Sequence, residues 1–335
     1  MGRLISLRNF LRVRPLLQRT LSVLFAFSAV SSNCFFPGES SGGVPQPLVN
    51  CGASLGHFLG GRSGYDFIPA MFTLAMAQMR VVGGDRLGNL GRAVDQIATA
   101  AAQGAAVVVL PEAMDLGWTH PSAPAEAEPV PDGASCRVLR EAARRHSIWV
   151  CAGLVERAGL EVFNAAVLID DRGSVVLHHR KLNELDLAHD CYAGGDRLGV
   201  VETPFGRLGV MICADAFAPG QPVARTLGLM GARMILSPCA WAVPADHDPV
   251  RDPYGQLWRD HYGTVARDFE LWIAGVSNVG VLSAGPWAGR RCIGCSLLVD
   301  PSGTPVVQGP YGVDAESLLI ARVAPRPWSR RGLGP

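Results

Sequence analysis

The sequence predicts an α/β fold in which mixed sheets are covered by helices. Short apolar runs of strand length alternate along the chain with segments of helical periodicity, and a β-α-β unit opens this alternation. Turns rich in Gly and Asp separate strands that form hairpins further along. Apolar residues make up 48% of the 335 residues and charged residues 18%, so the chain has the material for a large core.

The β-α-β unit covers residues 72–110. A strand over 72–79 (FTLAMAQM) comes first, and a helix over 89–103 follows with apolar residues at helical spacing. The continuous apolar run at 106–110 (AVVVL) is typical of a strand that is covered on both faces. We therefore expect the two strands to pair in parallel.

The remaining elements continue the alternation. In chain order, we expect a helix over 135–146, a strand over 149–154, a hairpin of 164–170 and 174–180, a strand over 207–212, a helix over 221–230, a strand over 234–237, a helix over 253–268, a strand over 271–277, and a final hairpin of 296–300 and 304–307.

Residues 1–70 differ from the rest of the chain, and we expect the folded domain to cover 71–335. Five Arg residues precede the first acidic residue, and a ten-residue apolar run then leads into small residues. Residues 1–34 thus have the outline of an export signal or transit peptide, and a Gly/Ser/Pro-rich linker follows. Alternatively, the reading frame is over-extended and the true start is Met71. That start predicts a cytoplasmic protein, whereas an address in 1–34 predicts export or organelle targeting.

Composition argues against several classes of protein. The net charge is +1 without a basic run, so no nucleic-acid partner is expected, and no apolar stretch reaches the length of a stable membrane span. Nine scattered cysteines do not predict a disulfide framework. The lone pair Cys292 and Cys295 indicates buried reduced thiols, with a redox pair as the alternative. The run 246–248 (DHD) is interpreted as a solvated loop, so we expect no metal and no cofactor.

One lysine, Lys181, stands among 29 arginines. It ends the predicted hairpin, while Glu112 follows the run VVVLP and Cys213 ends the run RLGVMI. Because groups beyond the carboxyl ends of parallel strands gather in one crevice, we expect the three side chains to meet. A carboxylate can take the proton of a thiol and later deliver it to a leaving amine, and an ammonium can stabilise an oxyanion. The backbone N–H of Ala214 is a candidate second oxyanion donor.

At these residues the sequence resembles the nitrilase superfamily of carbon–nitrogen hydrolases. The matching segments are VVLPEAMDLGW around Glu112, HHRKLNE around Lys181 and TPFGRLGVMICADAF around Cys213. The resemblance covers about 71–325 and implies a four-layer α-β-β-α sandwich, a Glu-Lys-Cys triad, no metal and at least a homodimer. By this match Glu112 is the general base and acid, Lys181 stabilises the oxyanion, and Cys213 is the nucleophile that forms a thioester.

Departures from the family pattern refine the expectation. Ala214-Asp215 follows the cysteine where nitrile-cleaving members carry Trp-Glu, which favours an amide or carbamoyl substrate of small size. Glu184 is the candidate for a second, substrate-positioning carboxylate, with a loop ion pair as the alternative. Asp215 is expected to pair with a cation or cap a turn.

Three aromatic residues are candidates for the pocket wall: Trp118, Tyr192 and Trp241. We expect changes at His179 or Arg180 to cost far less activity than changes at Lys181. The alternative functions are acyl transfer through the same thioester and a non-catalytic binding scaffold. Membrane acyltransferases of the superfamily carry several spanning helices, which this sequence lacks, and a scaffold would have lost a triad member.

Overall fold

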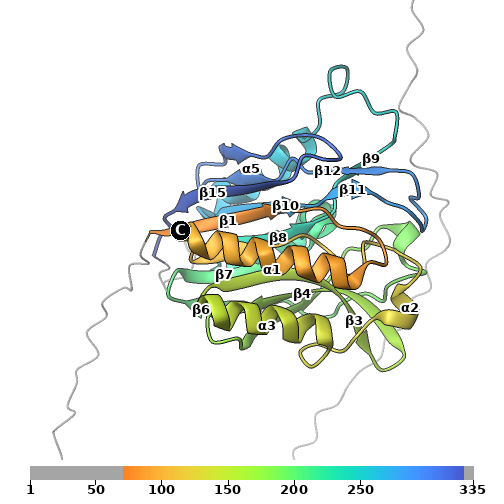
Figure 1. The fold of residues 1–335 in the computed structure, drawn as a ribbon. Coiled ribbons are helices and arrows are strands. Elements are labelled where there is room, and N and C mark those ends of the chain that lie inside the picture. Colours follow the sequence, from red (N-terminus) through yellow and green to blue (C-terminus); the bar gives the residue numbers. More distant parts are fainter. Residues whose placement is uncertain (1–70, 328–335) are drawn as a thin grey trace, which may run out of the picture. The chain divides into compact units, whose positions relative to one another are not determined.

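The computed structural model describes residues 71–327, which form two six-stranded sheets and a small three-stranded one (Figure 1). The expectations for residues 1–70, namely an address segment, a linker or an over-extended start, lie outside the described residues, as do Cys34 and Cys51. Within the described part, no helix is long and apolar enough to cross a bilayer.

The first sheet has the strand order β15-β1-β2-β3-β4-β5. Its strands are β1 (Phe72–Gln78), β2 (Val107–Val109), β3 (Trp149–Ala158), β4 (Glu161–Ile169), β5 (Val175–Arg180) and β15 (Ser317–Val323). Strands β1, β2 and β3 pair in parallel, and β3-β4 and β4-β5 are antiparallel. Strands β2, β3 and β5 therefore point in the same direction, so Glu112 and Lys181 follow strands that end at the same edge.

The second sheet has the order β14-β13-β10-β8-β7-β6. Its strands are β6 (Val200–Thr203), β7 (Gly206–Val210), β8 (Met234–Cys239), β10 (Trp272–Ser277), β13 (Leu297–Val299) and β14 (Pro305–Gln308). Strands β7, β8 and β10 are parallel neighbours. The small sheet joins β9 (Ala242–Val243), β11 (Val279–Val281) and β12 (Arg291–Ile293).

Helices cover the outer face of each large sheet. They are α1 (Arg86–Ala102) and α3 (Ala134–His146) on the first sheet, and α4 (Pro222–Leu229) and α5 (Gln256–Phe269) on the second. The short helix α2 (Ala123–Glu126) packs in a separate cluster with Trp118 and Tyr192. One core cluster joins α1 and α3 to the first sheet, a second joins α4 and α5 to the second sheet, and a third consists of residues from the facing sides of both sheets. Three cores separate four layers, which confirms the predicted α-β-β-α sandwich.

The predicted helices and strands are all present, with ends that differ by a few residues. Helix α1 begins three residues earlier than expected because the Asp85 side chain accepts a hydrogen bond from the Gly88 N–H at its start. Strand β4 begins at Glu161 and forms a long hairpin with β3 that was not predicted.

Several short strands were not predicted, among them β6, β9, β11 and β12. Strand β15 was also missed. It pairs with β1 along its whole length, from Phe72 against Val323 to Gln78 against Ser317. No local sequence pattern predicts these strands, because their hydrogen-bond partners are distant in the sequence or because the strands are only a few residues long.

Candidate active site

The three predicted site residues lie at the ends of strands and line one cavity. Glu112 follows β2, Lys181 follows β5, and Cys213 opens the 3₁₀ helix η2 (Cys213–Phe217) after β7. Two of these strands belong to the first sheet and one to the second. The site is therefore built where the carboxyl ends of both sheets meet.

Glu112 is 1% exposed and has two hydrogen-bond donors at Oε1. The Lys181 Nζ lies 2.7 Å away and the Asn164 Nδ2 also lies 2.7 Å away. The Glu112 N–H donates to the carbonyl of Cys239 at the end of β8 (3.2 Å). A Cβ on Gly153 of β3 would come within 2.5 Å of the Glu112 Cα, so only glycine permits this close packing. The carboxylate is thus fixed from both sheets.

Lys181 is buried (2% exposed) between two carboxylates. Besides Glu112, its Nζ lies 3.3 Å from Oε2 of Glu184, which is also buried. Burial alone would lower the pKa of Lys181, but the charges of Glu112 and Glu184 outweigh it and hold this pKa well above its ordinary range. Burial raises the pKa of Glu184, with Lys181 opposing the rise and Glu112 adding to it. The lysine is therefore a permanent ammonium.

Cys213 has a backbone φ of 43°, in the left-handed region that non-glycine residues seldom adopt. Ala113, next to Glu112, has a φ of 44°. Such strain persists only where the surrounding structure enforces it, and it concentrates at functional sites. Burial raises the pKa of the Cys213 thiol well above its usual range, the hydrogen bond with Cys239 and the Glu112 charge add to the rise, and Lys181 opposes it. The resting sulfur is therefore a thiol that needs a base.

Asp215 fixes the turn that carries Cys213. Its carboxylate accepts hydrogen bonds from the backbone N–H of Ile212 (2.9 Å) and of Leu182 and Asn183 (3.0 and 2.8 Å), and from the His179 Nε2 (2.8 Å). These donors flank both Lys181 and Cys213. Of the two predicted roles, pairing with a cation or capping a turn, the backbone contacts confirm the cap.

The environment of His179 differs from that of its neighbour Arg180. His179 is 1% exposed and bound to Asp215, whereas Arg180 is partly exposed and pairs with Glu156 (2.7 Å). From the sequence, changes at either residue were expected to cost far less activity than changes at Lys181. The contacts of Arg180 agree with that expectation, whereas a change at His179 would leave the buried Asp215 carboxylate without one of its hydrogen-bond partners.

The cavity at the triad has a volume of about 80 Å³ and walls that are mainly aromatic. Of the predicted wall residues, Trp118 and Trp241 line it and Tyr192 does not. The Tyr192 hydroxyl accepts from the Thr119 N–H (2.9 Å), so it supports the segment behind Trp118. Ala214 lines the cavity, and its carbonyl accepts from the Asn183 Nδ2 (2.7 Å).

Sequence reasoning missed several residues of the site. The wall also includes Leu185, Phe217, Tyr254, Trp258 and Trp287. Asn164 was a detectable signal, since it is a polar residue inside the apolar strand FNAAVL. The aromatic residues carried no such signal, because a tryptophan in a cavity wall and one in a core look alike in a sequence.

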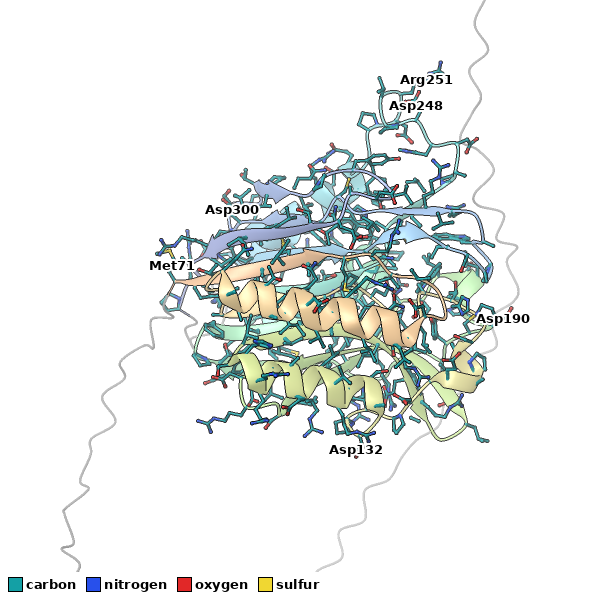
Figure 2. All side chains as sticks on the ribbon, viewed as in Figure 1. Met71, Asp132, Asp190, Asp248, Arg251 and Asp300 are labelled. Atoms are coloured by element: carbon teal, nitrogen blue, oxygen red, sulfur yellow. The ribbon has the colours of Figure 1, made fainter. Side chains whose placement is uncertain are left out.

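Two other predicted features lie apart from the triad. Cys292 and Cys295 are free, buried thiols that belong to different core clusters. In the loop with 246–248, His247 donates to or accepts from the Tyr311 hydroxyl (2.8 Å) and is mostly buried, while Asp248 projects at the loop tip (Figure 2). Within 71–327, no three His, Cys, Asp or Glu side chains are grouped as metal ligands.

The arrangement brings together a thiol, a carboxylate and an ammonium around one cavity. The carboxylate can accept the thiol proton, and the ammonium can stabilise negative charge that develops on an oxygen in the cavity. The second carboxylate, Glu184, balances the ammonium when Glu112 is protonated. These are the parts that acyl transfer to a cysteine requires.

A family model described as carbon-nitrogen hydrolase matches residues 73–328. A nitrilase of Pyrococcus abyssi is 35% identical over 218 residues, which are 64% of this chain and 75% of the relative. An omega-amidase of Danio rerio is 31% identical over 181 residues, or 51% of this chain and 64% of the relative.

A solved structure shares the fold at low sequence identity. The crystal structure of an amidase from a Nesterenkonia species matches 78% of this chain and 94% of its own, with a TM-score of 0.65 at 23% identity. The likeness extends to the sandwich of two sheets and its flanking helices.

Proposed function

Because this chain belongs to the carbon–nitrogen hydrolase family, the nitrilase superfamily, and is a hydrolase of carbon–nitrogen bonds other than peptide bonds, we propose that it cleaves a small amide through a cysteine thioester. One observation carries the mechanism. The buried Glu112–Lys181 pair (2.7 Å) and Cys213 line the same enclosed cavity, from the ends of three separate strands.

The first half of the reaction forms the thioester. Glu112 takes the Cys213 proton as the sulfur attacks the carbonyl carbon of the amide, and the oxyanion lies beside the Lys181 ammonium and the backbone N–H of Ala214. Glu112 then delivers the proton to the leaving nitrogen, so the carbon–nitrogen bond breaks and ammonia or an amine departs.

The second half returns the enzyme to its resting state. Glu112 takes a proton from a water molecule that attacks the thioester carbon. The carbon–sulfur bond then breaks, and Glu112 returns the proton to the departing Cys213 sulfur as the acid forms. Glu184 keeps the Lys181 charge balanced at both stages, because Glu112 alternates between its charged and neutral forms. Glu184 is therefore proposed as a positioning residue.

The cavity wall favours a short, neutral acyl group. A cavity of about 150 Å³ holds benzene in another protein, so about 80 Å³ suits roughly three to five non-hydrogen atoms. Lys181 is the one lysine or arginine among the cavity-lining residues that the structure describes, and two carboxylates already neutralise it. A carboxylate on the acyl group would be buried without a partner, which is costly.

The test compares two amides of equal shape and different charge. The purified chain is assayed for ammonia release from isobutyramide and from oxamate, whose acyl groups fit the size of the cavity, with and without EDTA. We expect at least about tenfold faster release from the neutral amide, since an unpaired buried charge costs more than 1.4 kcal/mol. EDTA should have no effect on either rate.

Two variants show whether the thiol is the nucleophile. Cys213→Ala should abolish release, whereas Cys136→Ala, which alters a buried thiol on α3 outside the cavity, should keep it. Preference for oxamate would show that the acyl group is not neutral, and it would leave the proposed mechanism unaffected. Activity that survives Cys213→Ala, or is lost with EDTA and restored by zinc, would overturn the mechanism.

A further inference from the structure

Cys239 is a buried thiol beside the triad that the proposed hydrolysis does not use. Strands β7 and β8 pair in parallel, with Val210 opposite Leu236. Beyond this pair, the Met211 N–H donates to the Leu236 carbonyl (3.2 Å), so the two segments stay adjacent. Paired residues of β7 and β8 are 26 positions apart in the sequence. The same offset places Cys239 opposite Cys213, just beyond the last paired residue of β7. Neighbouring strands are about 4.8 Å apart, which suits the Cα spacing of a disulfide.

The side chains of Cys213 and Cys239 pack in the same core cluster. The Cys239 Sγ lies 3.2 Å from the Ser237 carbonyl and 3.6 Å from the Tyr262 hydroxyl. Cys239 is fully buried, whereas Cys213 is only partly buried and lines the cavity. An oxidant that enters through the cavity therefore meets Cys213 first.

The other described cysteines are not arranged in this way. Cys292 and Cys295, the redox pair considered from the sequence, belong to different core clusters, and Cys136 and Cys151 also lie in separate cores. Among residues 71–327, the register of β7 and β8 continues to Cys213 and Cys239, and no other strand pairing there aligns two cysteines. The structure therefore favours Cys213 and Cys239 over Cys292 and Cys295 as the candidate redox pair.

We propose that Cys239 is a resolving cysteine: a small hydroperoxide oxidises Cys213, Cys239 closes a disulfide with it, and the hydrolase is switched off reversibly. This modification requires no assumption about which amide is the substrate. It uses the nucleophilicity of Cys213 and therefore shares one premise with the proposed function.

The chemistry balances in two steps. The Cys213 sulfur attacks the outer oxygen of the hydroperoxide, the O–O bond breaks, and the products are Cys213 sulfenic acid and an alcohol, or water if the oxidant is hydrogen peroxide. The Cys239 sulfur then attacks the Cys213 sulfur, the S–O bond breaks, and water leaves as the disulfide forms. The two thiols lose two electrons, which reduce the peroxide, and Glu112 can accept the Cys213 proton in the first step.

The disulfide removes the nucleophile without disturbing the rest of the site. Glu112 is held by the backbone carbonyl of Cys239, not by its side chain, so the carboxylate keeps its position when the sulfur reacts. The bond also protects Cys213 from further oxidation to sulfinic acid, which a thiol does not reverse. A dithiol such as dithiothreitol should restore the free thiols.

The experiment reads peptide masses, so its result does not depend on the amide assay. The whole chain is treated with hydrogen peroxide, its remaining thiols are blocked, and it is digested without reduction. We expect a peptide that contains Cys213 joined to one that contains Cys239, two hydrogens lighter than their sum. Both thiols should be lost together, and dithiothreitol should return both.

Variants separate a resolving role from a bystander role. In Cys239→Ser, peroxide should convert Cys213 to sulfinic acid, and dithiothreitol should no longer reverse the loss. Cys292→Ser and Cys295→Ser are the matched controls and should behave as the unmodified chain does. Cys239→Ala is the second variant, in case a serine disturbs the core.

Three results would overturn the proposal. They are oxidation of Cys213 without a link to Cys239, a Cys292–Cys295 link in its place, and the same reversible loss in Cys239→Ser as in the unmodified chain. The linked peptide of the unmodified chain decides the matter even if neither Cys239 variant folds. If the link forms but no amide is cleaved, the proposed function fails and this inference stands.

Discussion

Lys181 shows how much of this site is decided at single residues. The chain uses Arg at every other cationic position, yet the cation between Glu112 and Glu184 is an ammonium. A compact group with three freely directed donors can bind two carboxylates and still face an oxyanion, whereas a planar guanidinium needs more room. The requirement at this position is therefore geometry and not charge alone.

Lys181→Arg should fold and yet lose at least about 100-fold in turnover, the scale seen when one oxyanion donor is removed. The measurement is ammonia release together with a melting curve. Arg180→Lys is the matched control, since Arg180 binds Glu156 outside the cavity, and it should keep its turnover. If Lys181→Arg turned over normally, position 181 would need only a positive charge.

Asp215→Asn should weaken both stability and catalysis. The amide nitrogen of the new side chain would face donors where the carboxylate now accepts from Ile212 and His179. Leaving a buried hydrogen-bond donor unsatisfied costs about 1–3 kcal/mol, and a loosened Cys213 turn should lower turnover about 10- to 100-fold. Asp170→Asn is the control, because Asp170 caps a surface turn and should change stability by only about 1 kcal/mol.

The stability difference at Asp215 should depend on pH. Burial tends to raise the pKa of Asp215, but the hydrogen bond and charge of His179 and the backbone N–H groups outweigh it and hold this pKa below its ordinary 3.8. The stabilisation is therefore present above about pH 4 and is lost as the pH falls below it. Urea unfolding of both proteins at pH 3 and pH 7 measures this, and an equal difference at both pH values would contradict the role.

At the scale of elements, the site depends on where strands end. The ends of β2, β5, β7 and β8 deliver Glu112, Lys181, Cys213 and Cys239, and backbone hydrogen bonds join the segments that follow. Strand β3 is held against the segment after β2 by a buried carboxylate. Asp115 accepts from the N–H groups of Leu116 (3.0 Å) and Val155 (3.1 Å).

Asp115→Asn should remove a pH dependence of stability. Burial raises the pKa of Asp115 from 3.8 to about 6, although its backbone hydrogen bonds oppose the rise. Between these values the folded chain binds a proton that the unfolded chain does not, so wild-type stability falls as the pH rises from about 4 to 6. The two-unit shift corresponds to about 3 kcal/mol.

The check is urea unfolding of wild type and Asp115→Asn at pH 4, 5, 6 and 7. The stability of the variant relative to wild type should increase by about 3 kcal/mol across this range and then level off. Other carboxylates titrate equally in both proteins and cancel. A constant difference would show that Asp115 is charged throughout.

At the scale of the whole described structure, the sandwich aligns two sheets so that both contribute to one cavity. The core between the sheets contains side chains of β1 and β2 from one and of β8 and β10 from the other, fully buried. Such packing fixes the distance between the ends of the two sheets, because protein interiors are close-packed. One result of this packing is the hydrogen bond that the Glu112 N–H donates to the Cys239 carbonyl.

A chain that begins at Met71 should fold cooperatively and retain its turnover. Strand β1 begins at Phe72 and already has β15 on one side and β2 on the other, so the sheet pairing is complete within the described residues. Differential scanning calorimetry and ammonia release of the two chain lengths provide the comparison. Aggregation or a broad, non-cooperative melt of the shorter chain would show that residues 1–70 are needed for the fold.

Much of the fold and the centre of the site were predictable from local signals. Helical periodicity and apolar runs are properties of neighbouring residues, so α1, α3 and the buried strands were visible in the sequence. Glu112 and Cys213 were visible because each directly follows an apolar run, and Lys181 because it is the one lysine of the sequence and ends the predicted hairpin. Strand β15 and the aromatic wall were not, since pairing across the chain and the direction of a side chain leave no local pattern.

The sequence by itself determined the α/β class, the order of the main elements and the three side chains proposed for catalysis, because these depend on residue type and short-range spacing. The tertiary structure decided which groups surround them. It placed Asn164 and Glu184 around the Glu112–Lys181 pair, made Asp215 the anchor of the Cys213 turn, and set Cys239 opposite Cys213. The physical reason is that strand register and the packing of two sheets bring together residues tens of positions apart, and no local preference encodes that alignment.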